Sequence, residues 1–380
     1  MPERRRSKQA KPFAVPKHEQ SVLVLQGGGA LGAYQAGVYE GMAERGFAPT
    51  WVTGVSIGAI NGALIAGNVP ERRLERLRAF WDRVSSAIPL VVPAALNPLQ
   101  LAVNRASTMA AATFGVPGLF VPRVPPPYLV PDGSPGALSI YDTSPLRDTL
   151  EELVDFDLIN DKAVRLSVGS VDVHTGNSVY FDSLRQTIGP EHIMASGALP
   201  PGLPPIVIDG NHYWDGGIVS NSPLWYVLDD APGLSALIMQ VDLFSARGPV
   251  PLNLDQVLER SKDIQYSSKT RFNSSRVEEL EGMRAALGRL LEKLPPKLRE
   301  DPDYQLLAPL CRRQHHITLV HLINRRSTYS SSDKDYLFSR GEVQQLWDTG
   351  LEDVRRSCAH PQWRKATEAE HGIRVFDLTR

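Results

Sequence analysis

The sequence has little cysteine, no long apolar run and no excess of charge of either sign. Its two cysteines, Cys311 and Cys358, lie far apart in 380 residues, which excludes a disulfide framework and matches no zinc-site spacing. The formal net charge is −1, so no global field favours nucleic acid, and we expect no nucleic-acid partner. Without a run of 18 apolar residues, we expect no membrane-spanning helix.

The first 20 residues, "MPERRRSKQAKPFAVPKHEQ", are basic and have no apolar segment of the kind found in secretory signals. We expect residues 1–20 to be a disordered basic tail, with contact to an anionic membrane surface as the alternative. This reading predicts a cytoplasmic location, peripheral membrane contact remaining open. A homo-oligomer also remains open.

The remainder has globular composition, 42% hydrophobic and 22% charged, which suffices for a sizeable core. Apolar runs typical of buried strands alternate with helical patterns, which predicts an α/β fold with a mostly parallel sheet. The expected strands include residues 21–26, 51–55, 165–173, 177–183, 235–244 and 315–323. The expected helices are residues 30–45, 71–84, 274–300 and 341–358.

Two segments have an unusual apolar character. Residues 88–135 are apolar, proline-rich and nearly free of acidic residues, and they are too long for a structureless loop. We expect short helices and turns that form a cap or lid. The helix at 274–300 carries an apolar stripe, for which we expect packing on the core or on a second subunit, with membrane contact as the alternative. The stripe comprises Leu280, Met283, Leu287, Leu290, Leu291 and Leu294.

A glycine loop, "GGGALG" at residues 27–32, lies between the first strand and the first helix. Backbone N–H groups and the helix dipole make such a loop an anion site, for a phosphate or an oxyanion. Gly27, Gly29 and Gly32 fit the dinucleotide pattern G-x-G-x-x-G. The acidic ribose ligand expected about 20 positions later is missing, because residues 51–53 are Trp-Val-Thr. This disfavours NAD binding, and we expect no cofactor and no metal.

A second motif, "GVSIG" at residues 54–58, follows the second strand and opens a helix. G-x-S-x-G at a strand-to-helix junction is typical of a nucleophile elbow, in which Ser56 sits on a strained turn. Gly54 and Gly58 allow the strand and helix to approach closely. We therefore interpret Ser56 as a nucleophile.

A serine nucleophile needs a base to accept its proton. Asp215 ends a strand and enters a turn at Gly216 and Gly217, and burial would raise its pKa toward the working range. Read alone, this D-G-G is an ordinary β-turn. The histidines do not stand out as alternative bases, and only one strand precedes the elbow, unlike in α/β-hydrolases. The histidines considered are His174, His212, His315, His316 and His321.

Taken together, the motifs resemble the patatin-like phospholipase family. Four blocks carry the resemblance in order and spacing: residues 27–32, 54–58, "ASGALPPGLPP" at 195–205, and "DGG" at 215–217, followed by Asn221 and Pro223. The resemblance implies a patatin-like three-layer α/β/α fold for a catalytic domain at 21–245, with the cap at 88–135 as an insertion.

The resemblance also implies a serine acyl hydrolase of the lipase or phospholipase A type, without metal or cofactor. Its catalytic dyad is Ser56 and Asp215. The oxyanion hole comes from Gly27, Gly28 and Gly29, and the supporting motif glycines are Gly32, Gly54, Gly58, Gly216 and Gly217. The substrate is a lipid or another acyl ester, with a storage polyester as one alternative and a weakly active lipid-binding or regulatory protein as another.

One position departs from the family. Leu31 stands where many members carry Arg or Lys, which removes a positive charge near the oxyanion and is the feature that favours the regulatory alternative. Residues 246–380 form a C-terminal extension, of which about 273–378 resemble an extension found in a subset of bacterial patatin-like proteins, through "HHITLVHLINRR", "DKDYLFSR" and "GIRVFDL". We expect this extension to be α/β and to pack on the core.

Overall fold

The fold is built on a nine-stranded sheet in the computed structural model, which describes residues 19–88, 97–230, 235–268, 270–312, 316–325, 334–359 and 372–377. The strands are β1 (Gln20–Leu25), β2 (Trp51–Val55), β3 (Val121–Pro122), β4 (Tyr141–Asp142), β5 (Arg165–Asp172), β6 (Ser178–Asp182), β7 (Ile206–Ile208), β8 (Asn211–Asp215), β9 (Ser235–Asp242), β10 (His316–Ile323) and β11 (Gly372–Asp377). The sheet order is β11-β10-β9-β1-β2-β5-β8-β7, with β6 also paired to β5, while β3 and β4 form a separate pair.

The sheet is mostly parallel. Strands β11, β10, β9, β1, β2 and β5 run parallel, whereas β6, β7 and β8 join antiparallel at the β5 end. The predicted α/β class and its buried strands are therefore confirmed. Nearly all residues of β2, β5 and β9 are buried because both faces of the sheet are covered.

Helices connect and cover the strands. They are α1 (Ala33–Ala43), α2 (Ile57–Ala66), α3 (Pro70–Val84), α4 (Asn97–Phe114), α5 (Ser144–Leu153), α6 (Phe156–Asn160), α7 (Pro190–Ser196), α8 (Leu224–Asp230), α9 (Leu254–Tyr266), α10 (Thr270–Glu292), α11 (Pro302–Arg312) and α12 (Arg340–Ala359). Short 3-10 turns are η1 (Gly29–Gly32), η2 (Pro127–Leu129), η3 (Pro135–Leu138), η4 (Gly216–Ile218), η5 (Pro296–Glu300) and η6 (Lys334–Tyr336). Across the described residues, no helix combines the length and apolarity that a bilayer crossing needs.

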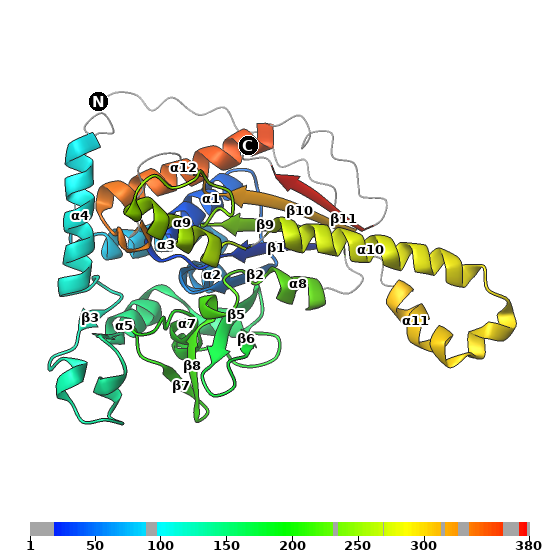
Figure 1. The fold of residues 1–380 in the computed structure, drawn as a ribbon, viewed down its shortest axis with the longest axis horizontal. Coiled ribbons are helices and arrows are strands. Elements are labelled where there is room, and N and C mark those ends of the chain that lie inside the picture. Colours follow the sequence, from blue (N-terminus) through cyan, green and yellow to red (C-terminus); the bar gives the residue numbers. More distant parts are fainter. Residues whose placement is uncertain are drawn as a thin grey trace.

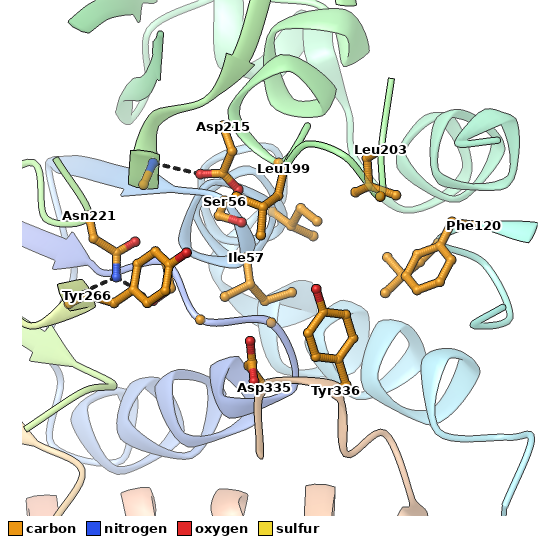
Figure 2. A pocket seen from close by; sticks show the side chains of 18 of the residues that line it. Ser56, Ile57, Phe120, Leu199, Leu203, Asp215, Asn221, Tyr266, Asp335 and Tyr336 are labelled. Atoms are coloured by element: carbon orange, nitrogen blue, oxygen red, sulfur yellow. Dashed lines mark hydrogen bonds between the residues drawn. The ribbon is translucent and has the colours of Figure 1, made fainter. Parts of the chain in front are cut away.

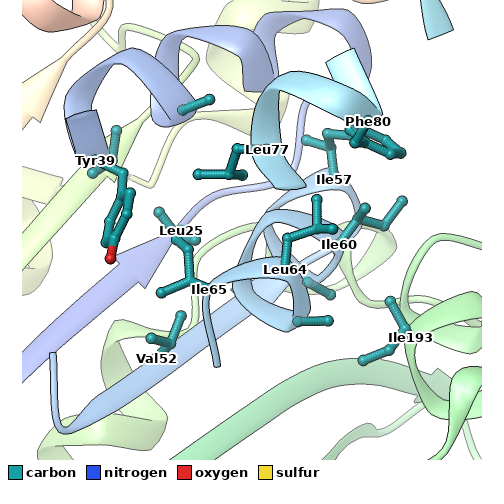
Figure 3. Close-up of a cluster of buried hydrophobic side chains, with 14 of the residues drawn as sticks. Leu25, Tyr39, Val52, Ile57, Ile60, Leu64, Ile65, Leu77, Phe80 and Ile193 are labelled. Atoms are coloured by element: carbon teal, nitrogen blue, oxygen red, sulfur yellow. The ribbon is translucent and has the colours of Figure 1, made fainter. Parts of the chain in front are cut away.

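Alternating side chains of β1 enter two apolar clusters. Leu23 and Leu25 belong to the larger cluster, which α1, α2, α3 and α12 cover; Figure 3 shows α2 in its midst. Val22 and Val24 belong to a smaller cluster on the opposite face, together with Leu224 and other residues of α8. The sheet is therefore the middle of three layers, with more helices on one face than on the other. The carboxyl ends of its parallel strands point toward the cap (Figure 1).

The C-terminal region continues the same sheet. β10 pairs with β9 along its whole length, and β11 pairs with β10. α12 packs against α1 so closely that a Cβ at Gly37 would lie 1.9 Å from the carbonyl oxygen of Trp347. The Tyr34 hydroxyl donates to the Asp353 carboxylate at 2.9 Å. The expected catalytic domain (21–245) and the expected extension (246–380) therefore share one sheet and one helical layer.

The helix expected at 274–300 ends earlier than predicted, because α10 stops at Glu292 and η5 follows. Only part of its apolar stripe is buried: Leu291 is buried, Leu287 and Leu294 are half-buried, and Met283 and Leu290 are exposed. Met283 and Leu290 therefore do not pack on the core of this chain, while packing on a second subunit stays a prediction. Figure 1 shows α10 and α11 extending away from the rest of the chain.

The expected cap differs in its helices. The sequence suggested only short helices, but α4 spans 18 residues. A helix of this length can form because proline is absent between residues 99 and 116. The segment then returns through β3 and η2. Residues 89–96 and the predicted disordered tail, apart from Glu19 and Gln20, lie outside the described residues.

Candidate active site

Ser56 occupies the turn between β2 and α2 with φ 55° and ψ −124°, a conformation that non-glycine residues rarely adopt. Its backbone N–H donates to Ser196 Oγ at 3.0 Å, and Ser196 Oγ donates to the Gly169 carbonyl at 2.6 Å. The Ser56 carbonyl accepts from Ala59 N–H and Ile60 N–H, which are early bonds of α2. Hydrogen bonds on both sides thus hold the strained turn.

The glycines of the elbow are there for steric reasons. A Cβ at Gly54 would lie 2.2 Å from the Gly58 carbonyl oxygen, and a Cβ at Gly58 would lie 2.4 Å from the Leu25 carbonyl oxygen. β1, β2 and α2 therefore meet with no room for a side chain at either position. This close approach brings the glycine loop after β1 next to Ser56.

Asp215 reaches Ser56 through the antiparallel end of the sheet. Ser170 of β5 pairs with Asp215, and the preceding Gly169 pairs with Val55 of β2, so a single strand separates the two chain segments. The Ser56 hydroxyl lies close enough to the Asp215 carboxylate to lower its pKa, and Figure 2 shows the two side chains facing each other. The structure therefore brings together the two residues predicted to form the dyad.

The carboxyl group of Asp215 is buried, with 3% of the residue exposed. Burial raises its pKa to about 6, and the nearby Ser56 hydroxyl and the Gly217 N–H act in the opposite direction. The Gly217 N–H donates to Oδ1 at 2.7 Å, and the Asp215 N–H donates to the Ala198 carbonyl at 3.0 Å. At neutral pH this carboxylate is ionised yet has a pKa suited to accepting a proton.

The glycine loop lies beside Ser56, but its three expected donors are not equivalent. The Gly27 N–H donates to the Asn221 carbonyl at 3.2 Å, and Asn221 Nδ2 donates to the Gly27 carbonyl at 3.1 Å. The Gly27 N–H is therefore already bonded and does not face an oxyanion, in contrast to the expectation that Gly27 belongs to the oxyanion hole. The N–H groups of Gly28 and Gly29 have no recorded acceptor among the described residues. Leu31 is buried in the core.

A cavity opens in front of Ser56 and Asp215. Its apolar wall comes mainly from α2, the cap and the segments around β4 and after α7: Ile57, Ile60, Leu119, Phe120, Tyr141, Leu146, Leu199 and Leu203. Tyr266, Asp335 and Tyr336 also line it (Figure 2). Among the described residues that line the cavity, none is Lys, Arg or His. Of the histidines considered as bases, His174, His212 and His321 lie elsewhere, while His315 and the His316 side chain are not described.

Within the described residues, no group of three His, Cys, Asp or Glu side chains is arranged to hold a metal ion. The glycine loop and the start of α2 instead present backbone N–H groups, which suit an anion. The chemistry of this arrangement is that of a hydroxyl with an adjacent buried base and nearby amide donors.

Comparison with known proteins assigns the chain to a family. A family model described as patatin-like phospholipase matches residues 23–228, more than half of the sequence. The chain belongs to the patatin-like phospholipase family. A second model, DUF3734, described as patatin phospholipase, matches residues 264–370 in the C-terminal extension. The family resemblance is thereby confirmed, and the family supports lipid acyl hydrolase activity in general.

Among solved structures, the crystal structure of VipD from Legionella pneumophila is similar at 15% identity, covering 92% of this chain and 72% of that chain, with a TM-score of 0.32. No curated protein matches.

Several residues of this patatin-like site escaped the sequence analysis. Gln26 is fully buried; its Oε1 accepts from the N–H groups of Leu243 and Phe244, and its Nε2 donates to the Tyr266 carbonyl at 3.0 Å. A polar residue that ends an apolar strand directly before three glycines was a usable signal for Gln26. Tyr266 had no such signal because it lies outside every motif block, and Asp335 lies in "DKDYLFSR", which indicated the C-terminal extension but not a place at the site.

Proposed function

We propose that this patatin-like protein is a serine hydrolase that cleaves acyl esters of lipids, with Ser56 as nucleophile and Asp215 as base. The observation that carries the proposal is the Ser56 hydroxyl facing the buried Asp215 carboxylate, beside a glycine loop (Figure 2). A serine hydroxyl needs such a base, and a carboxylate with a raised pKa serves near neutral pH.

In the proposed reaction, Ser56 Oγ attacks the ester carbonyl while Asp215 accepts the hydroxyl proton. The N–H groups of Gly28 and Gly29 and the adjacent helix ends stabilise the tetrahedral oxyanion, each donor contributing on the order of 10²–10³ in rate. Asp215 then protonates the departing alcohol, which leaves an acyl ester on Ser56. Water that gives its proton to Asp215 attacks this ester, and the proton returns to Ser56 as the fatty acid leaves.

The apolar wall of the cavity supports a lipid as the substrate. Ile57 and Ile60 extend it from the elbow, and Leu119 and Phe120 of the cap close it farther away. Such a wall suits an acyl chain, because each buried CH₂ contributes about 0.8 kcal/mol. We also propose that the protein contacts the membrane peripherally, since its substrate resides there.

The test is hydrolysis of a p-nitrophenyl acyl ester and labelling by a fluorophosphonate. Ser56→Ala is expected to abolish both. Ser170→Ala is the matched control, because Ser170 is also buried, pairs with Asp215 in the sheet and has a hydroxyl without a hydrogen-bond partner. Turnover that persists in Ser56→Ala would reject the proposal. Absence of labelling in the unaltered protein would favour the lipid-binding alternative.

A further inference from the structure

Tyr266, Asp335 and Tyr336, all from the C-terminal region, line the cavity of Ser56. We propose that they form the subsite for the leaving alcohol, and that this subsite selects esters of an uncharged, hydroxylated alcohol over esters whose head group carries a phosphate. This inference rests on the proposed function and adds to it the class of alcohol that the enzyme releases.

The cavity has two chemically different sides. Figure 2 shows Ser56 and Asp215 between Tyr266 on one side and Leu203 and Phe120 on the other. The side of Leu203 and Phe120 is apolar and suits an acyl chain. The leaving alcohol then lies toward Tyr266 and Asp335, where hydroxyl and carboxylate groups gather.

Tyr266 is held by the side-chain amides of Gln26 and Asn221, and Asn221 also binds the glycine loop. The Tyr266 carbonyl accepts hydrogen bonds from Gln26 Nε2 at 3.0 Å and from Asn221 Nδ2 at 2.9 Å. Its ring packs on Phe244 with centroids 5.5 Å apart. The tyrosine is therefore placed in the cavity with a fixed relation to Ser56, as a specificity-determining residue must be.

Asp335 is fixed from two directions. A Cβ at Gly29 would lie 2.3 Å from the Asp335 carbonyl oxygen, so η6 rests directly on the glycine loop. The Asp335 carboxylate pairs with Lys262 of α9 at 2.8 Å, and the neighbouring Lys334 pairs with Asp263 at 2.6 Å. These η6–α9 ion pairs hold Asp335 and Tyr336 against the site.

The charges at the cavity disfavour an anionic head group. The described lining residues include the carboxylates of Asp215 and Asp335 and no cationic side chain. The cation nearest to Asp335 is Lys262, whose charge that carboxylate already balances. A phosphate placed here would lose water and face like charge without a counterion, which is costly in a partly buried site.

The two tyrosines present neutral hydroxyl groups. Burial raises the pKa of Tyr336 to about 12, and Asp335 and Asp215 act in the same direction. Burial together with the same two carboxylates also raises the pKa of Tyr266. A protonated phenol both donates and accepts hydrogen bonds, as recognition of an alcohol hydroxyl requires.

The test compares kcat/KM for 1-octanoylglycerol and 1-octanoylglycerol 3-phosphate, both below their micellar concentrations. The unaltered protein is expected to prefer the uncharged ester. Asp335→Asn leaves Lys262 without its counter-charge, so we expect the preference to fall about tenfold. Lys262→Gln exposes Asp335, so we expect the preference to rise.

Two further variants separate this from a structural effect. Glu259→Gln removes one partner of Lys334 without changing a cavity residue, so it should leave the preference unchanged even if both rates fall. Tyr266→Phe should lower kcat/KM for 1-octanoylglycerol more than for p-nitrophenyl butyrate, which has no alcohol hydroxyl to bind. An unaltered protein that prefers the phosphate ester overturns the inference.

A preference unmoved by both Asp335→Asn and Lys262→Gln also overturns it. The proposed function is tested separately, by comparing hydrolysis of p-nitrophenyl butyrate by the unaltered protein and by Ser56→Ala. If turnover depends on Ser56 but the preference between the two glycerol esters does not change, only the inference about the alcohol subsite is rejected. Turnover that does not depend on Ser56 overturns the proposed function and this inference together.

Discussion

The hydroxyl of Ser196 accepts a hydrogen bond of 3.0 Å from the backbone N–H of Ser56. Two residues later, the Ala198 carbonyl accepts from the Asp215 N–H at 3.0 Å. The last residue of α7 and the segment that follows therefore support both residues of the proposed dyad, although they contribute neither of the reacting groups.

Ser196→Ala should weaken both stability and activity. The change leaves the Ser56 N–H and the Gly169 carbonyl without their buried partner, which costs about 1–3 kcal/mol in free energy of unfolding. We expect kcat to fall about tenfold or more as the turn loses its definition. Urea unfolding and p-nitrophenyl butyrate kinetics measure the two effects. A kcat equal to that of the unaltered protein would show that Ser196 does not position Ser56.

Activity should follow the ionisation of Asp215. The carboxylate accepts a proton only when ionised, and burial raises its pKa to about 6. We therefore expect kcat/KM to rise with pH through about 6 and to level off above about 7. The profile is measured with a substrate that does not itself ionise. A profile that is flat from about pH 4.5 to 8 is incompatible with Asp215 as the base.

Asp215→Asn should be inactive but more stable at neutral pH. The pKa of Asp215 is about 6 in the fold and about 3.9 when unfolded. Its contribution to stability is thus present below about pH 4 and is lost as pH rises through about 6, a loss of about 2–3 kcal/mol by pH 7. Asparagine retains an acceptor for the Gly217 N–H without the charge.

The measurement for Asp215→Asn is urea unfolding of both proteins across this pH range. We expect the variant to gain on the unaltered protein as pH rises, and the difference to shrink toward about pH 4. A stability difference that does not change with pH would contradict the raised pKa.

Gly29→Ala should damage the glycine loop. Gly29 has φ +55°, and a Cβ there would lie 2.3 Å from the Asp335 carbonyl oxygen. We expect a loss of about 10²–10³ in kcat from displaced oxyanion donors, with reduced stability. Gly46→Ala is the control, because Gly46 has φ +76° and no atom within 4 Å of the added Cβ. If both variants behave alike, backbone strain alone accounts for the effect.

The cap should bind lipid surfaces. Val124 is 92% exposed and Tyr128 is 91% exposed, and both follow Phe120, which lines the cavity. Apolar groups of this exposure gain free energy by entering a bilayer interface. The double variant Val124→Ser, Tyr128→Ser should co-sediment less with phosphatidylcholine vesicles, while hydrolysis of p-nitrophenyl butyrate is unchanged. Equal co-sedimentation of the double variant and the unaltered protein would show that these cap residues do not contact the membrane.

Several features of this fold were predictable because local sequence specifies them. The apolar runs of β1 and β2 indicate strands buried on both faces. The elbow around Ser56 requires Gly54 and Gly58 because strand and helix must approach closely. The periodicity of α10 correctly predicted a helix, but periodicity defines an apolar face and not its partner, and Met283 and Leu290 proved exposed.

The sequence by itself determined the strand, glycine loop and elbow that present Ser56, because neighbouring residues decide those conformations. Only the tertiary structure decided that Tyr266 and Asp335 line the same cavity. Those contacts depend on α9 and on the placement of β10 beside β9, which carries η6 to the glycine loop. No local pattern encodes such contacts, since they arise from the order of strands and from ion pairs between distant segments.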